Sequence, residues 1–121
     1  MKFLMTYTQK PDLPPPTQAK MAEIGAFAEK NMKAGILLMT GGLVRPSRGI
    51  QLRCEEGKVS VTDGPFAETK ELIDGFALVK VGSRDEAVAI GSEFMRIAGD
   101  GTAEVLQVFD QADGPPVPPA R

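Results

Sequence analysis

The sequence predicts one α+β domain of the ferredoxin-like kind, in which two helices cover one face of an antiparallel sheet. Three observations lead to this prediction. Apolar residues alternate along several short segments, two longer segments carry an apolar stripe at helical spacing, and their order is β-α-β, hairpin, β-α-β. A chain of 121 residues and 12.9 kDa has room for one such domain and not for two.

The first half of the chain predicts a strand, a helix and a second strand. Residues 2–8 alternate and are rich in strand formers, and the prolines that follow indicate a stiff loop. Thr17 stands where a helix cap belongs, and Gly35 is a typical helix end. Between them lies one apolar stripe, made of Met21, Ile24, Phe27, Ala28 and Met32. The second strand begins at Ile36 and runs toward Leu43.

Residues 50–62 predict a β-hairpin. Glu56-Gly57 supplies the turn, since Gly57 can take a positive φ. The alternation then places five apolar side chains on one face: Ile50, Leu52, Cys54, Val59 and Val61. We expect that face, and Cys54 with it, to be buried and the thiol to be inert.

The second half of the chain predicts another strand, helix and strand. Residues 75–81 are apolar at both parities, which is typical of a central strand buried on both faces. Ser83 and Glu86 form a capping box at the start of a helix, and residues 103–109 are the last strand. Right-handed crossovers would place the 75–81 strand beside the first strand.

Two helices can cover only one face of this sheet. The strands nevertheless carry apolar side chains on both faces, as Phe3 and Met5 do against Leu4. A second copy of the same sheet is the simplest cover for the other face, so we expect a homodimer.

The composition excludes several classes of function. The chain has no histidine and one cysteine, which removes Ser-His-Asp and Cys-His nucleophile pairs and Cys/His metal sites, so we expect no metal and no cofactor. A net charge of −2 with scattered cations argues against nucleic-acid binding. No stretch predicts a signal peptide or a membrane span, so we expect a cytoplasmic protein without a membrane partner.

The segment after the hairpin has an unusual pattern. Asp63 can accept backbone N–H bonds at a turn, Gly64 permits a positive φ, and Pro65 suits the first position of a helical turn. Phe66 would enter the core. Three charged side chains then follow within four residues: Glu68, Lys70 and Glu71. Without further information, a capped and solvated turn is the simplest interpretation.

Residues 63–71 read Asp-Gly-Pro-Phe-Ala-Glu-Thr-Lys-Glu, and in this signature the chain resembles the YCII-related, DGPF-type family. The resemblance extends over a domain of residues 1–112, followed by a proline-rich tail over 113–121. It implies a dimeric α/β barrel, a small bacterial protein and genes near those of extracytoplasmic-function sigma factors. It implies no established reaction.

Two departures from the family pattern matter for chemistry. A His-Asp pair suggested for YCII-like relatives cannot exist here, because the chain lacks histidine. The last strand reads Glu104-Val105-Leu106-Gln107 where the family tends to have Glu-Val-Arg-Pro, which removes a cation that could meet an anionic ligand.

We therefore expect a protein that binds a small molecule in the cleft between sheet and helices, as a sensor or accessory protein that could associate with a sigma factor. The candidate ligand-binding residues are Asp63, Phe66, Glu68, Lys70, Glu71, Arg53 and Tyr7. The alternative is a small enzyme without histidine or metal. Its carboxylates would exchange protons, Lys70 or Arg53 would hold an anion, and Tyr7 would act as a weak acid.

Overall fold

The structure is a computed structural model that describes residues 1–10, 13–43, 49–63 and 73–109. Within these ranges the elements follow the predicted order. They are β1 (Lys2–Gln9), α1 (Gln18–Lys33), β2 (Leu37–Gly42), β3 (Ile50–Glu55), β4 (Lys58–Asp63), β5 (Gly75–Lys80), α2 (Arg84–Ala98) and β6 (Gly101–Val108). The α+β class is confirmed.

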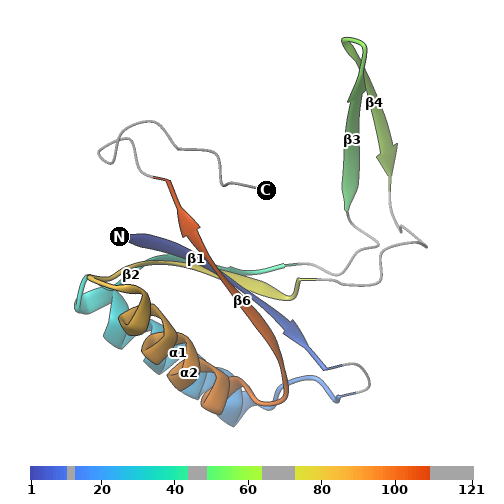
Figure 1. The fold of residues 1–121 in the computed structure, drawn as a ribbon. Helices are drawn as coiled ribbons and strands as arrows, with labels where there is room; N and C mark the ends of the chain where they lie inside the picture. Colours follow the sequence, from blue (N-terminus) through green and yellow to red (C-terminus); the bar gives the residue numbers. More distant parts are fainter. Residues whose placement is uncertain (11–12, 44–48, 64–72, 110–121) are drawn as a thin grey trace.

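Four strands form the main sheet in the order β2-β5-β1-β6, and each pair of neighbours is antiparallel. The first strand and the 75–81 strand lie together at the centre, as the crossover rule predicts. Both helices pack on one face of this sheet (Figure 1). This is the ferredoxin-like arrangement that the order of the elements predicted.

The core lies between the sheet and the helices. Phe3 opposes Val79 in the register of β1 and β5, and both side chains are buried there. Ala87 reaches this layer from α2 and is fully buried. Alternation puts every second residue of these strands into the core, as their sequences predict.

The other face of the main sheet has no second layer within the described residues. The cross-strand register places a row of apolar side chains across it: Met39, Leu78, Leu4 and Leu106. Met39 is 55% exposed and Leu106 is 51% exposed. The 75–81 strand is inside the sheet as predicted, with Val79 buried on the helix-covered face and Leu78 half-buried on the other.

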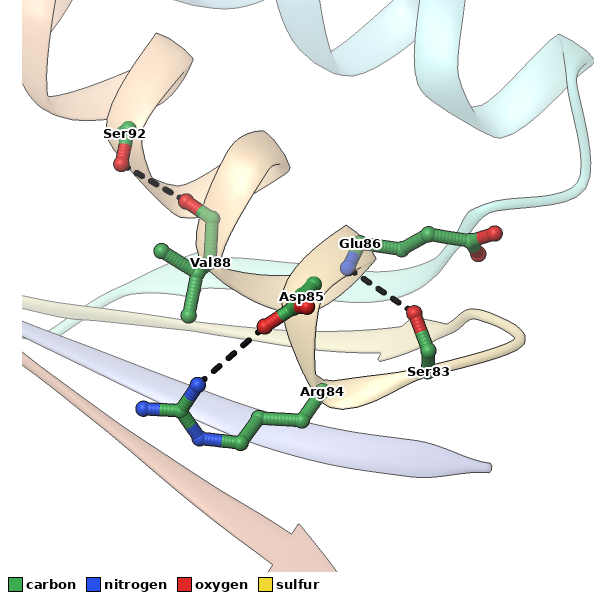
Figure 2. Close-up of polar contacts among 6 residues, drawn as sticks. All are labelled: Ser83, Arg84, Asp85, Glu86, Val88 and Ser92. Atoms are coloured by element: carbon green, nitrogen blue, oxygen red, sulfur yellow. Dashed lines mark hydrogen bonds and ion pairs between the residues drawn. The ribbon is translucent and has the colours of Figure 1, made fainter.

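Side chains cap both helices at the predicted positions. Thr17 Oγ1 accepts a hydrogen bond from the Lys20 N–H at 3.1 Å, at the start of α1. At the start of α2, Ser83 Oγ accepts from the Glu86 N–H at 3.2 Å (Figure 2). The Glu86 carboxylate accepts from the Gly82 N–H at 2.7 Å, one residue before the cap. These two bonds therefore satisfy the backbone N–H of Glu86 in the first turn of α2 and the backbone N–H of Gly82 just before the helix.

The β3–β4 hairpin forms a two-stranded sheet of its own and projects from the helix–sheet body (Figure 1). Glu56 and Gly57 make the predicted turn, with φ of 50° and 79°. All residues of both strands are exposed. The prediction that Cys54 is buried is therefore wrong for the single chain. Alternation identified the face on which Cys54 lies, but no residue of the described ranges covers that face.

Candidate functional site

The structure places three of the seven candidate residues. Tyr7 lies on β1 in the main sheet, whereas Arg53 and Asp63 lie on the hairpin. Both hairpin side chains are exposed, and Arg53 is opposite Ser60 on the polar face. The structure does not bring Tyr7 together with the two hairpin residues. The other four, Phe66, Glu68, Lys70 and Glu71, lie outside the described residues.

Tyr7 fastens the end of α2 to the sheet. Its ring meets the ring of Phe94 edge-on, with 5.5 Å between centroids and an interplanar angle of 86°. Its hydroxyl donates toward the backbone carbonyls of Asp100, at 3.2 Å, and Gly99, at 3.4 Å. Burial raises the pKa of Tyr7 above 10, and the carboxylates of Asp74 and Asp100 raise it further. The phenol is thus neutral at pH 7, and its proton is directed to the backbone. This geometry suits a structural clamp better than a general acid.

Asp74 joins three strands at the same end of the sheet. Its Oδ2 accepts from the Gln9 N–H at 2.7 Å, and its own N–H donates to the Tyr7 carbonyl at 2.7 Å. Its carbonyl accepts from the Leu43 N–H at 2.9 Å. Our sequence reasoning missed this residue. The available signal was an Asp directly before the Gly that opens a strand, where a short carboxylate can accept local N–H groups.

Two further residues complete the contacts at the end of α2. Lys20 Nζ lies 3.5 Å from the Ala98 carbonyl, where a cation also complements the helix dipole. Gly101 lies against Tyr7 so closely that an added Cβ would stand 2.8 Å from the phenol oxygen. The contacts of Tyr7, Lys20 and Gly101 therefore hold the end of α2 tightly against the sheet.

An open depression of about 770 Å³ lies at the opposite end of the main sheet. It is bounded by the end of α1, the start of β2, the end of β5 and one side of α2. Its apolar wall includes Ile36, Val81 and Ile90. Its charged lining residues are Glu86, Glu93, Lys80 and Met1, whose amino group donates to the Val81 carbonyl at 2.9 Å. Glu86 already accepts from Gly82, and Glu93 lies 3.7 Å from Lys30 in an exposed ion pair. None of the predicted candidate residues lines this depression.

Two general observations apply to the described part of the chain. No three acidic or cysteine side chains in these ranges come together in a way that could hold a metal ion. Neither described helix is long and apolar enough to cross a membrane.

Comparison with known proteins identifies the family. The YCII-related domain matches residues 1–112. The chain belongs to the YCII-related family. A curated relative, the uncharacterized protein R00369 of Rhizobium meliloti (strain 1021), is 41% identical over 68 residues. The aligned part covers 56% of this chain and 55% of that protein, so it spans about half the length of the relative.

Membership in the YCII-related family confirms the resemblance that the sequence suggested. This relative is itself described as uncharacterized. The chemistry of this family member must therefore be argued from its own residues.

Proposed function

We propose that this protein binds a small molecule in the depression between the helices and the end of the sheet. The observation that carries the proposal is the volume of about 770 Å³ behind an apolar wall. Small-molecule sites typically occupy about 300–1,000 Å³ and combine mostly apolar walls with a few polar groups.

The lining indicates the kind of ligand. Ile36, Val81 and Ile90 offer aliphatic contact, whereas the carboxylates of Glu86 and Glu93 are acceptors only. Both carboxylates have a partner in the protein. A ligand can replace Lys30 as the partner of Glu93, because an exposed ion pair contributes little free energy. Lys80 and the amino terminus of Met1 line the depression as well, so its two carboxylates are balanced by two cationic groups. We therefore expect a small, largely apolar molecule that carries one polar group.

A titration followed by ¹H–¹⁵N correlation spectra would test this proposal. The probes are a panel of small aliphatic and aromatic amines, with the matching carboxylic acids for comparison. We expect at least one member of the panel to cause saturable shifts of the amides at 34–36, 80–82 and 86–93. Shifts confined to residues 63–74 would instead support the signature segment as the ligand site. No saturable binding across the panel would contradict the proposal.

A pair of neighbouring variants provides the control. Ala89 lines the depression, whereas Val88 is the adjacent residue of α2, does not line it and is 44% exposed. Ala89→Trp should fill the space and weaken binding at least tenfold, and Val88→Trp should leave the affinity unchanged. Equal effects of both variants would show that the ligand does not occupy the depression.

We also propose that the protein is a homodimer that pairs the open faces of two main sheets. The support is the apolar row Met39, Leu78, Leu4 and Leu106, whose outer members Met39 and Leu106 are exposed within the described part of the chain. Light scattering at micromolar concentration should give twice the chain mass of 12.9 kDa, about 26 kDa. A mass of one chain under these conditions would contradict the pairing.

This protein would act as a sensor or accessory protein in the cytoplasm if ligand binding changed its contact with a partner protein. The resemblance to a family with genes near sigma factors supports a sigma factor as the partner. Co-purification of the two proteins, with and without the compound that binds in the titration, would test this role. Co-purification that is absent in both conditions would remove the sigma factor as a partner.

A further inference from the structure

Two carboxylates on one face of α2 stand on either side of an apolar side chain. Glu86 and Glu93 both line the depression, and Ile90 lies between them on the helix. Residues three, four and seven positions apart share one face of a helix, so all three side chains are on the side of α2 that bounds the depression. Ile90 also packs against the buried core. A ligand with its apolar part on Ile90 can therefore place its polar group beside either carboxylate.

The two carboxylates differ in the contacts that they already make. Glu86 accepts from the Gly82 N–H at 2.7 Å and thereby helps to begin α2. Glu93 lies 3.7 Å from Lys30 Nζ, whereas a close hydrogen bond between two charged groups measures about 2.7–2.9 Å. The Lys30 side chain is 72% exposed and the Glu93 side chain is 47% exposed. Glu93 is therefore the carboxylate that a ligand can approach without breaking a bond that the fold uses.

The two cationic groups at the depression are less available than Glu93. The amino group of Met1 donates to the Val81 carbonyl at 2.9 Å, and the Val81 N–H donates to the Met1 carbonyl at the same distance. This pair of bonds ties Met1 to the neighbouring strand. Lys80 follows the buried Val79 and lies opposite Lys2 in the register, so strand alternation directs its side chain to the sheet face without helices.

We infer that Glu93 selects the ligand of the depression and that Lys30 competes with the ligand for this carboxylate. The inference rests on the proposed small-molecule binding and narrows its ligand to an aliphatic amine. A carboxylate only accepts hydrogen bonds, so the polar group of the ligand must donate. No aromatic ring lines the depression in the described part of the chain, so an aliphatic body fits it better than a stacked ring.

The competition arises because the ion pair joins two helices. Lys30 is on α1 and Glu93 is on α2, and the two helices cover the same face of the sheet (Figure 1). An ammonium group that binds Glu93 takes the place of Lys30 Nζ. An exposed ion pair contributes little, so the loss of this competition changes the affinity by about two- to fivefold. Removal of Lys30 therefore strengthens binding, whereas a purely structural ion pair would have no such effect.

Isothermal titration calorimetry at pH 7 and low ionic strength tests the inference, with hexylamine and hexanoate as the two probes. We expect the wild type to bind hexylamine and not hexanoate. Glu93→Gln should weaken hexylamine binding about tenfold, because it removes a charged acceptor. Lys30→Met should strengthen it about two- to fivefold. The opposite signs of the two effects distinguish a competitor from an ion pair that only stabilises the site.

A second ion pair on α1 provides the matched control. Lys33 Nζ lies 3.0 Å from Glu29, and these side chains are 77% and 68% exposed. Neither residue is among those that line the depression. Lys33→Met and Glu29→Gln change the net charge as the two test variants do, and both should leave the affinity unchanged. Equal effects of the test and control variants would assign the change to overall charge and refute the role of Glu93.

The remaining outcomes overturn the inference in distinguishable ways. Hexylamine binding that Glu93→Gln leaves unchanged would refute the role of Glu93 but keep the depression as a binding site. A loss confined to Glu86→Gln would assign the polar contact to the other carboxylate. Weaker binding by Lys30→Met would show that Lys30 supports the ligand. A preference for hexanoate, or binding of other panel members without hexylamine, would refute the amine and leave the proposed function standing.

Discussion

Gly101→Ala should destabilise the protein, because the first residue of β6 is placed where a methyl group does not fit. An added Cβ would stand 2.5 Å from the Thr8 carbonyl oxygen and 2.8 Å from both Cε1 and the hydroxyl oxygen of Tyr7. The carbonyl belongs to the backbone of β1, which is held between two neighbouring strands. The Tyr7 ring is held by Phe94 and by the carbonyls at the end of α2. Neither neighbour can move without breaking a bond or a packed contact.

The magnitude follows from two opposing effects. Forcing a methylene or methyl group into a packed site costs about 1–3 kcal/mol. Replacing glycine reduces the conformational entropy of the unfolded chain and returns roughly 0.5–1 kcal/mol. We therefore expect a net loss of about 1–2 kcal/mol. For a chain of this size the melting temperature should fall by roughly 4–8 °C.

Gly25→Ala is the matched control, because an added Cβ there meets nothing within 4 Å. Gly25 lies inside α1, where alanine is favoured over glycine by about 0.8–1 kcal/mol. This variant should melt a few degrees above the wild type. Both are measured by calorimetry at one protein concentration, since the proposed dimer would make the melting temperature depend on concentration. If Gly101→Ala melts as high as the wild type, the close packing of Tyr7 on β6 is refuted.

Three more predictions concern the same end of the sheet and the helix caps. The absorbance of Tyr7, the one tyrosine in a chain without tryptophan, should titrate with a pKa above 10. Because the folded state holds this proton more tightly than the unfolded state, stability should fall as the pH rises above about 10; a normal pKa and flat stability would contradict the burial. Asp74→Asn should lower the pKa of Tyr7, because it removes a nearby negative charge. The amide oxygen still accepts from the Gln9 N–H, and an unchanged titration curve would show that Asp74 does not influence the phenol. Ser83→Ala should cost about 1 kcal/mol in urea denaturation, and Ser92→Ala, whose hydroxyl donates to the Val88 carbonyl within the helix, should cost less; the reverse order would refute the capping role.

The sequence predicts local structure and topology well because both depend on short-range chemistry. Thr17 and Ser83 mark their helices by the hydrogen bonds that they accept, and Glu56-Gly57 marks its turn by backbone conformation. The central position of the first strand follows from the order of the elements and the preference for right-handed crossovers. Each of these predictions is confirmed.

The burial of a side chain and the position of the candidate site are harder to predict, because both depend on which distant parts of the chain pack against a residue. Alternation correctly grouped Cys54 with Leu52, but it could not reveal that the hairpin stands apart from the body. Asp74 belongs to no periodic segment, so its ties to three strands appear only in three dimensions. The depression is formed by the ends of four separate elements, which no single motif encodes.

The central place of β1 has a consequence for biosynthesis. This strand is made first, yet its two neighbours are residues 75–80 and 101–108. Until β6 has left the ribosome, residues 2–9 have at most one partner, and their apolar side chains stay without a complete sheet. Such non-local pairing slows folding and leaves nascent strands open to aggregation. We therefore expect the helix–sheet body to form only after residue 108 has emerged, with α1 and the hairpin as the parts that can organise earlier.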